Sequence, residues 1–181
     1  YLSISLDKAE QLEDLINEFF EITRFNLSNI TLKYSDINLT RLLEQLIYEF
    51  NPMLKEKNLQ CVLHSAKDIM LHCDANKMQR VFDNLLRNAA IYSYSDTEIT
   101  ITTELRANKV TIVFENCGAN IPEEKLEQIF EQFYRVDTAR SMANGGAGLG
   151  LAIVKHIVAQ HNAALHLDSE LDEGTTIEIV F

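Results

Sequence analysis

The sequence is poor in the residues that mark several large classes of protein. Its 181 residues contain only three cysteines and no Cys-x-x-Cys pair, so neither disulfides nor zinc is indicated, and we expect buried thiols in a reducing cytoplasm. No apolar run approaches the roughly 20 residues that a membrane span needs, and no signal peptide is visible. Acidic residues outnumber basic ones, and the net charge of −11 argues against a nucleic-acid partner.

The chain begins without a Met, and a helical pattern is already running at residue 1. Residues 1–26 predict a helix with a narrow apolar seam, which cannot bury its stripe alone. We expect a second copy to cover this seam in a helical bundle; docking onto the chain's own domain is the alternative. We place the boundary just after this helix, and we expect a longer protein with an upstream membrane anchor.

Glycine is also scarce, yet four of the six glycines fall between residues 145 and 150. Apolar residues then recur at helical spacing from Leu151 to Val158, so the loop opens a helix. Bare N–H groups and the positive end of a helix favour phosphate, and we interpret residues 145–151 as a nucleotide phosphate site. The Gly-Lys-Ser/Thr of a P-loop and the third glycine of a dinucleotide fingerprint are both missing. The alternative is a flexible loop that ends in an ordinary helix cap.

The rest of the chain mixes strand and helix patterns. The expected elements are a strand at 30–34, a helix at 39–54 that Pro52 bends or breaks, strands at 59–64 and 69–73, a helix capped by Asp74, a hairpin of 98–104 and 109–115, a helix from Pro122 to about Phe130, a mobile polar lid at 131–148, and a hairpin of 164–169 and 175–181.

Two asparagines share one flank of the helix that follows Asp74. Asn84 and Asn88 lie four residues apart, and asparagine is a poor helix former, so the pair needs a reason. Their carboxamide oxygens could bind Mg²⁺ directly or hold its waters. The alternative is a pair of solvent-facing side chains.

Five short motifs follow one another in a fixed order. They are Asn84-Leu-Leu-Arg-Asn88, Asn116-Cys-Gly118, Phe130 with Phe133-Tyr134-Arg135, Gly146-Ala-Gly148-Leu-Gly150, and Gly174-Thr175-Thr176. In this order they resemble the N, G1, F, G2 and G3 boxes of sensor histidine kinases. The resemblance spans residues 30–181, and residues 1–27 are similar to the second helix of the family's dimerisation hairpin. Residues 130–151 most resemble the vancomycin-resistance sensor kinases.

The resemblance implies an α+β fold of the Bergerat type, a two-layer sandwich in which helices cover one face of a mixed sheet and ATP lies between helix and lid. Asn88 would bind Mg²⁺ with help from Asn84, and Arg135 and Arg140 of the lid would neutralise charge on the transferred phosphoryl group. The nucleotide-binding residues that it implies are Asn84, Asn88, Tyr92, Asn116, Gly118, Ile121, Tyr134, Arg135, Gly146, Ala147, Gly148, Leu149, Gly150, Leu151, Thr175 and Thr176. Solvated lid charge is the alternative for the two arginines.

Within this set the resemblance gives each end of the nucleotide its own residues. Tyr92 would pack near the adenine or ribose, Asn116 would face the adenine amino group, and Thr175 and Thr176 would close the adenine end. The glycines of the loop would present backbone N–H groups to the phosphates.

Three departures from the family pattern lower the expected affinity for ATP. Asn116 stands where Asp is usual, and its oxygen accepts a hydrogen bond without the help of a charge. Asn120 replaces the second glycine of its box, and Ile91 replaces a basic residue that reaches the phosphates in many members. We therefore predict weak nucleotide binding, which a dissociation constant in the low micromolar range or tighter would contradict.

The family transfers the γ-phosphoryl group to a histidine that an acidic residue follows on the first dimerisation helix. The chain's five histidines, at positions 64, 72, 156, 161 and 166, lie in no such context, and His161 is expected to stabilise a helix dipole. We expect the chain to bind ATP without phosphorylating itself. The full protein would form a homodimer through the N-terminal helix, lie in the bacterial cell membrane and pass the phosphoryl group to a response regulator.

Two other functions fit parts of this sequence. A gyrase- or Hsp90-type ATPase needs a carboxylate one turn before the Mg²⁺-binding asparagine; here that position is Asn84, and Asp83 points elsewhere on the helix. A degenerate domain that serves only as a dimerising scaffold is the non-enzymatic alternative, and thermal shift with ATP and Mg²⁺ separates it from a binding domain.

Overall fold

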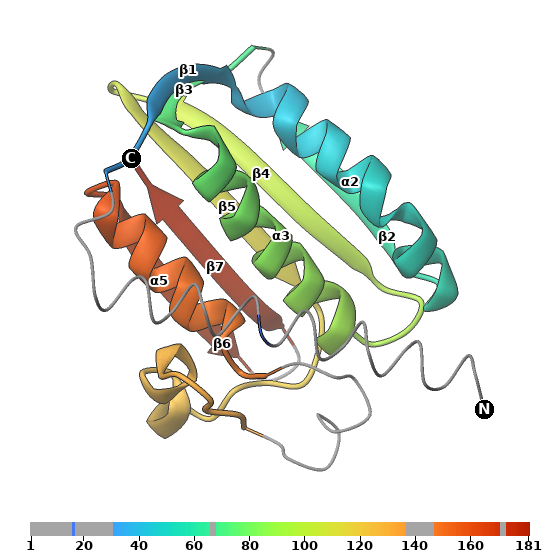
Figure 1. Cartoon of the computed structure of the whole chain (residues 1–181). Coiled ribbons are helices and arrows are strands. Elements are labelled where there is room, and N and C mark those ends of the chain that lie inside the picture. The colour runs from blue at the N-terminus through green and yellow to red at the C-terminus, as the bar shows by residue number, and fades with distance from the viewer. Residues whose placement is uncertain (1–15, 17–30, 66–67, 137–146, 171–172) are drawn as a thin grey trace.

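The computed structural model of the chain describes residues 16, 31–65, 68–136, 147–170 and 173–181 (Figure 1). The predicted dimerisation helix, apart from Ile16, and residues 137–146 of the predicted lid lie outside the described residues.

The architecture is a sheet with helices on one face. Five strands pair in the order β2-β4-β5-β7-β6, with β2 parallel to β4 and the other neighbours antiparallel. The helices α2, α3 and α5 lie side by side across one face of this sheet (Figure 1). The bounds are β2 Gln60–Ser65, β4 Glu98–Arg106, β5 Lys109–Asn116, β6 Ala164–Glu170, β7 Gly174–Val180, α2 Leu39–Glu56, α3 Ala75–Tyr92 and α5 Gly150–Gln160. The predicted two-layer α+β sandwich with a mixed sheet is confirmed.

Alternation along the strands explains why one face is covered. In β4 and β5, Ile99, Ile101 and Ile112 are fully buried, whereas the residues between them are half-buried on the other face. Each helix presents one apolar stripe, and in α3 this stripe includes Val81, Phe82 and other buried residues. The core therefore lies between the sheet and the three helices, and polar groups at its ends are free to form a site.

A second, two-stranded sheet joins β1 (Tyr34–Asn38) to β3 (Met70–Asp74). The strand predicted at 30–34 therefore begins only at its last residue, because pairing runs from Tyr34 opposite Asp74 to Asn38 opposite Met70. Asn38 then caps α2 by accepting a hydrogen bond from the Arg41 N–H.

The structure excludes one of the two expected effects of Pro52, a break in the helix, and corrects the helix predicted after Pro122. Helix α2 continues through Pro52 to Glu56, because Phe50 and Leu54 remain on the buried stripe and hold its last turns on the core. The predicted helix after Pro122 is instead two short 3₁₀ turns, η1 (Glu123–Lys125) and η2 (Gln128–Phe130). Ile129 is the one buried residue in these turns, so no apolar stripe is present to hold a regular helix.

The three cysteines are free thiols, and one of them is fully buried. Burial and the Asp74 charge raise the pKa of Cys73 to about 12, and burial and the Glu98 charge do the same for Cys61. The expectation of three buried thiols is wrong for Cys61 and Cys117, which are half-buried at the ends of strands. Among the described helices, none is long and apolar enough to cross a membrane.

Candidate nucleotide site

The start of α5 lies directly on the predicted asparagine pair. No side chain caps this helix, whose N-cap residue is Leu149, so the first backbone N–H groups have no capping partner among the described side chains. A Cβ placed on Gly150 would lie 2.7 Å from Oδ1 of Asn84, closer than real Cβ atoms approach other atoms. Glycine therefore allows the uncapped helix start to meet the Asn84 amide.

Asn84 is held in one orientation. Its Nδ2 donates to the backbone oxygen of Arg80 at 2.9 Å, which leaves Oδ1 to face Gly150. Asn88 follows one turn later on the same flank of α3 and is half-buried. We call Asn84, Asn88 and the start of α5 the phosphate end of the site.

The donor set of the phosphate end fits Mg²⁺. Carboxamide oxygens are hard ligands, and Mg²⁺ in nucleotide sites takes only one or two protein ligands because phosphates and waters supply the rest. The described residues contain no cluster of three or more His, Cys, Asp and Glu side chains that could hold a metal without a nucleotide. Asn84 and Asn88 would thus hold Mg²⁺, which would neutralise charge on the phosphates.

The two described ends of the predicted lid meet beside this helix start. The Phe133 N–H donates to the Gly148 oxygen at 2.9 Å. Gly148 has φ +73°, and a Cβ there would lie 2.9 Å from the Tyr134 oxygen and 3.1 Å from Cγ of Arg135. Tyr134 and Arg135 therefore pack on the glycine loop. Arg140 and Gly146 lie outside the described residues.

Other members of the predicted loop face the core. Leu149 is 1% exposed, and Ala147 and Leu151 are half-buried and pack against the same core. These three residues can offer a ligand their backbone groups, while their side chains fix the loop in place.

The C-terminal end of α3 is joined to the segment that follows β5. Ser93 and Gly118 form a β-bridge, and the Tyr94 N–H donates to the Cys117 oxygen at 3.0 Å. A Cβ on Gly118 would lie 2.4 Å from the Tyr92 oxygen. Tyr92, which is 49% exposed, is thereby brought beside the glycine of the G1 motif.

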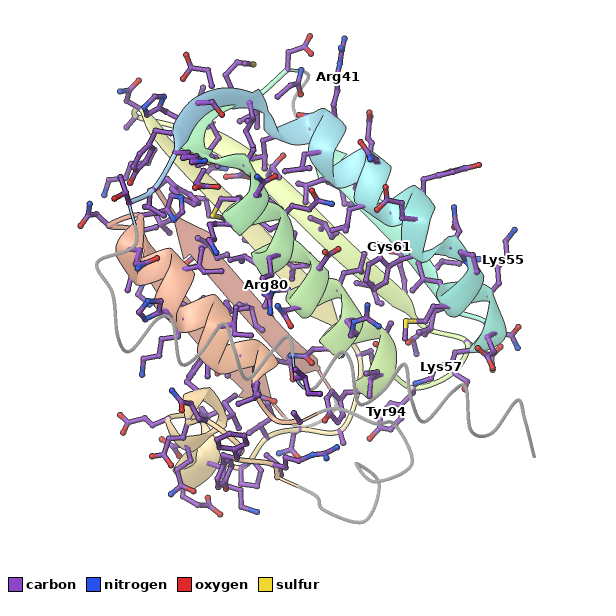
Figure 2. The ribbon with its side chains drawn as sticks, viewed as in Figure 1. Arg41, Lys55, Lys57, Cys61, Arg80 and Tyr94 are labelled. Carbon is purple, nitrogen blue, oxygen red and sulfur yellow. The ribbon has the colours of Figure 1, made fainter. Side chains whose placement is uncertain are left out.

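Lys57, the residue that follows α2, binds the same C-terminal end of α3. Nζ of Lys57 donates to the backbone oxygens of Ala90 at 2.9 Å and Ile91 at 2.7 Å, and Figure 2 shows Lys57 beside Tyr94 at this end of α3. The charge offsets the negative end of the helix dipole. A cation is thus present near Ile91, although on a different element from the one the family pattern uses.

Strand register assembles the remaining polar groups. Asn116 of β5 pairs with Thr175 of β7, which pairs with Ser169 of β6. Directly paired residues share a face, and the neighbouring row Phe114, Ile177 and Leu167 packs on the core, so this polar row continues the helix-covered face. We call Tyr92, Gly118 and this row the base end of the site.

Thr176 is not part of this row. It pairs with Glu115 and Asp168, and successive strand residues point to opposite faces, so its side chain lies on the open face of the sheet. Of the two adjacent threonines, the structure brings only Thr175 toward Asn116.

Sequence reasoning missed Ser169, which connects the base end. Its hydroxyl accepts from the Ile121 N–H at 2.9 Å and lies 3.2 Å from both the Gly174 oxygen and Oγ1 of Thr175. Ile121, a predicted site residue, is therefore held through its backbone. A serine five residues before Gly174 is too ordinary a signal to identify without the strand register.

The start of α3 is joined to the end of α5. The buried His161 accepts from the Asp74 N–H through Nε2, and Nδ1 donates to the Ile157 oxygen at the end of α5. Burial alone would raise the pKa of Asp74, but hydrogen bonds from the Lys33 and Lys77 N–H groups and the nearby charges lower it overall. Both the Asp74 cap and the position of His161 at a helix end agree with the sequence predictions.

Asp83 and the other histidines are not among the predicted site residues. The charges that act on Asp83 belong to Arg87, Glu49 and Arg80, two of which lie on α3 and one on α2, and burial raises the pKa of this carboxyl. His156 lies in α5 but is followed by Ile157, not by an acidic residue, and His64, His72 and His166 lie in strands.

A family model described as histidine kinase-, DNA gyrase B-, and HSP90-like ATPase matches residues 73–181. This match covers more than half of the chain, and the chain belongs to that family.

Two curated relatives define the branch. The sensor protein VanS of Enterococcus faecium is 48% identical over 179 residues, which are 99% of this chain and 46% of VanS. The sensor protein VanSC of Enterococcus gallinarum is 44% identical over 170 residues, covering 94% of this chain and 47% of VanSC. The chain spans about half the length of these relatives.

Solved structures share the fold. Full-length ShkA in complex with AMPPNP matches with a TM-score of 0.85 at 21% identity, covering 96% of this chain and 36% of ShkA. The histidine kinase ThkA in complex with the response regulator protein TrrA matches with a TM-score of 0.78 at 23% identity, covering 96% of this chain and 48% of that chain.

Proposed function

We propose that this domain holds ATP and Mg²⁺ along α3, with the phosphates at the start of α5 and the base at Tyr92, Asn116 and Thr175. The close approach of Gly150 to Asn84 carries the proposal, since the start of α5, which no described side chain caps, then lies next to a carboxamide oxygen of the kind that Mg²⁺ accepts. Eight residues separate Asn84 from Tyr92, which is about 12 Å along a helix and suits an extended nucleotide.

Each group then has a role in phosphoryl transfer. Asn88 and Asn84 hold Mg²⁺, which neutralises charge on the phosphates when it is bound. Arg135, together with Arg140, stabilises the charge of the transferred group, and the backbone N–H groups of the glycine loop orient the phosphates. Tyr92 packs against the base, Gly118 and Ile121 shape the walls around it, and Tyr134 packs on the glycine loop.

In the full protein, this domain would phosphorylate a histidine on a dimerisation helix, and the phosphoryl group would then pass to an aspartate of a response regulator. The match to ThkA, whose complex with a response regulator is known, supports such a partner. The match to the sensor protein VanS supports a role in sensing. We propose further that the full protein is membrane-anchored, dimerises through the predicted helix at 1–27 and serves antibiotic resistance.

The test is calorimetry and thermal shift with ATP and Mg²⁺. A ligand that binds only the folded state must raise the melting temperature, by an amount equivalent to about 2.7 kcal/mol at a concentration of one hundred times Kd. We expect binding weaker than low micromolar, and loss of binding in Asn88→Ala with an unchanged ligand-free melting curve. A wild-type chain whose melting temperature ignores millimolar ATP would overturn the proposal and favour a binding-inactive scaffold.

Autonomous ATP hydrolysis is the second function that the family includes, and the site argues against it. The position one turn before Asn88 holds the neutral Asn84, whose carboxamide cannot accept a proton from the attacking water as a carboxylate can. Asp83 lies among charges of α2 and α3, so it is not aimed at the phosphate end. Incubation with γ-labelled ATP should release no phosphate above background and leave the chain unlabelled.

A further inference from the structure

The hydrogen bonds of the Ser169 hydroxyl can be assigned from its valence. Oγ lies 2.9 Å from the Ile121 nitrogen, 3.2 Å from the Gly174 oxygen and 3.2 Å from Oγ1 of Thr175. A serine hydroxyl has one hydrogen and two acceptor lone pairs, a peptide N–H can only donate, and a carbonyl oxygen can only accept. One arrangement makes all three contacts hydrogen bonds: Ile121 donates to Ser169, Ser169 donates to Gly174, and Thr175 donates to Ser169.

This arrangement fixes what Thr175 can offer a ligand. Its only hydroxyl hydrogen points at Ser169, so its remaining capacity is that of an acceptor. Thr175 stands directly opposite Asn116 in the register, on the face that α3 covers. A base bound beside Asn116 therefore meets a fixed acceptor at Thr175.

Asn116 is not fixed in the same sense. A carboxamide can present either its oxygen or its NH₂ group by turning over, whereas the aspartate usual at this position can only accept. Asn116 alone therefore does not separate a purine with a 6-amino group from one with a 6-carbonyl group. Discrimination between the two kinds of purine must come from a neighbouring group whose hydrogen-bonding role is fixed.

We propose that Ser169 is a specificity-determining positioning residue, which makes the base end prefer a 6-amino purine over a 6-oxo purine by fixing the Thr175 hydroxyl as an acceptor. A 6-amino group has two hydrogens, one for Asn116 and one for Thr175. A carbonyl in its place sets two acceptors against each other at Thr175, and an unpaired polar contact of this kind lowers affinity by roughly tenfold or more. The inference rests on the proposed ATP site.

The experiment compares ATP with inosine triphosphate, which differs only at position 6 of the base and its neighbouring ring proton. Calorimetry with Mg²⁺ on the 181-residue chain gives the ratio of the two affinities for wild type, Ser169→Ala and Ser169→Thr. We expect a wild-type preference for ATP of roughly tenfold, a ratio near one in Ser169→Ala, where the Thr175 hydroxyl can rotate and donate, and rescue in Ser169→Thr. Thr111→Val, on the open face opposite Val180, is the matched control and keeps the ratio.

Ser169→Ala also removes the hydrogen bond from the Ile121 N–H, so a second variant is needed that leaves this bond intact. Thr175→Val removes the fixed acceptor and should also lower the ratio, and adding Ser169→Ala to it should change the ratio no further, because Ser169 acts through Thr175. A ratio that stays at the wild-type value in both single variants, or no wild-type preference, overturns the inference while ATP binding still stands. A wild-type chain that binds neither nucleotide overturns the proposed function itself.

Discussion

The phosphate end and the base end of the site are built in opposite ways. The phosphate end uses bare backbone, and the Gly150 Cα meets Asn84 so closely that a single added carbon would lie 2.7 Å from Oδ1. The base end uses side chains, and its groups meet because Asn116, Thr175 and Ser169 stand in register across three strands. The first end is therefore sensitive to added atoms, and the second to removed hydroxyls and amides.

The largest expected effect is at the phosphate end. Gly150→Val places a branched side chain against Asn84 and should reduce ATP affinity at least roughly a hundredfold, because the asparagine must leave its place. Calorimetry with ATP and Mg²⁺ measures the loss. The ligand-free melting temperature shows whether the fold survives, and a variant that binds ATP normally would break the comparison.

At the base end, two adjacent threonines give the next test. Thr175→Val should weaken ATP binding by roughly tenfold, the typical effect of one lost hydrogen bond with its partner left unpaired. Thr176→Val, on the open face, should change affinity less than about twofold. The same titration serves for both variants, and a stronger effect from Thr176 would show that the faces are assigned the wrong way round.

A smaller gain is expected from Asn116→Asp. A carboxylate accepts the adenine amino hydrogen with the help of its charge, so ATP affinity should rise by about threefold to tenfold. It also cannot turn over to donate, so binding of inosine triphosphate should fall. If calorimetry shows weaker ATP binding, then Asn116 does not face the amino group.

The smallest effect is expected at Asp83, which lies on a different flank of α3 from Asn84 and Asn88. Burial raises the pKa of Asp83, the Arg87 charge lowers it in part, and the Glu49 charge raises it again. A carboxyl with a raised pKa contributes its stability below the ordinary aspartate pKa and loses it as pH rises through the folded value, so at neutral pH its charge is unfavourable. Asp83→Asn should raise the neutral melting temperature by about 1–2 °C, a gain that vanishes in acid, with ATP affinity unchanged.

The same contrast explains what could be predicted from sequence. The phosphate end follows from local patterns, since Asn84 and Asn88 repeat at helical spacing and Gly148 and Gly150 precede a helix. The two-layer fold follows from alternating strands and amphipathic helices. Both signals lie within a few residues of chain, where spacing determines direction.

The base end depends on long-range pairing that no short pattern contains. Which of two consecutive threonines faces the core is set by the register of β7 on β5, and a shift of one residue would reverse it. Ser169 and Lys57 reach the site from distant elements, through hydrogen bonds that no motif records. The helix expected after Pro122 fails for a different reason, because local capping signals cannot replace a missing apolar stripe.

The hydrogen bond from the Asp74 N–H to His161 joins the start of α3 to the end of α5. Because the two helices are joined at this point, a ligand that separates them moves their other ends apart, and the separation grows with distance from the joined ends. Asn84 lies ten residues from Asp74 and Tyr92 lies eighteen, which is about 15 Å and 27 Å along the helix. Helix α5 begins at Gly150, beside Asn84, so the phosphate end lies where the two helices can separate most, whereas Tyr92 lies beyond the reach of α5.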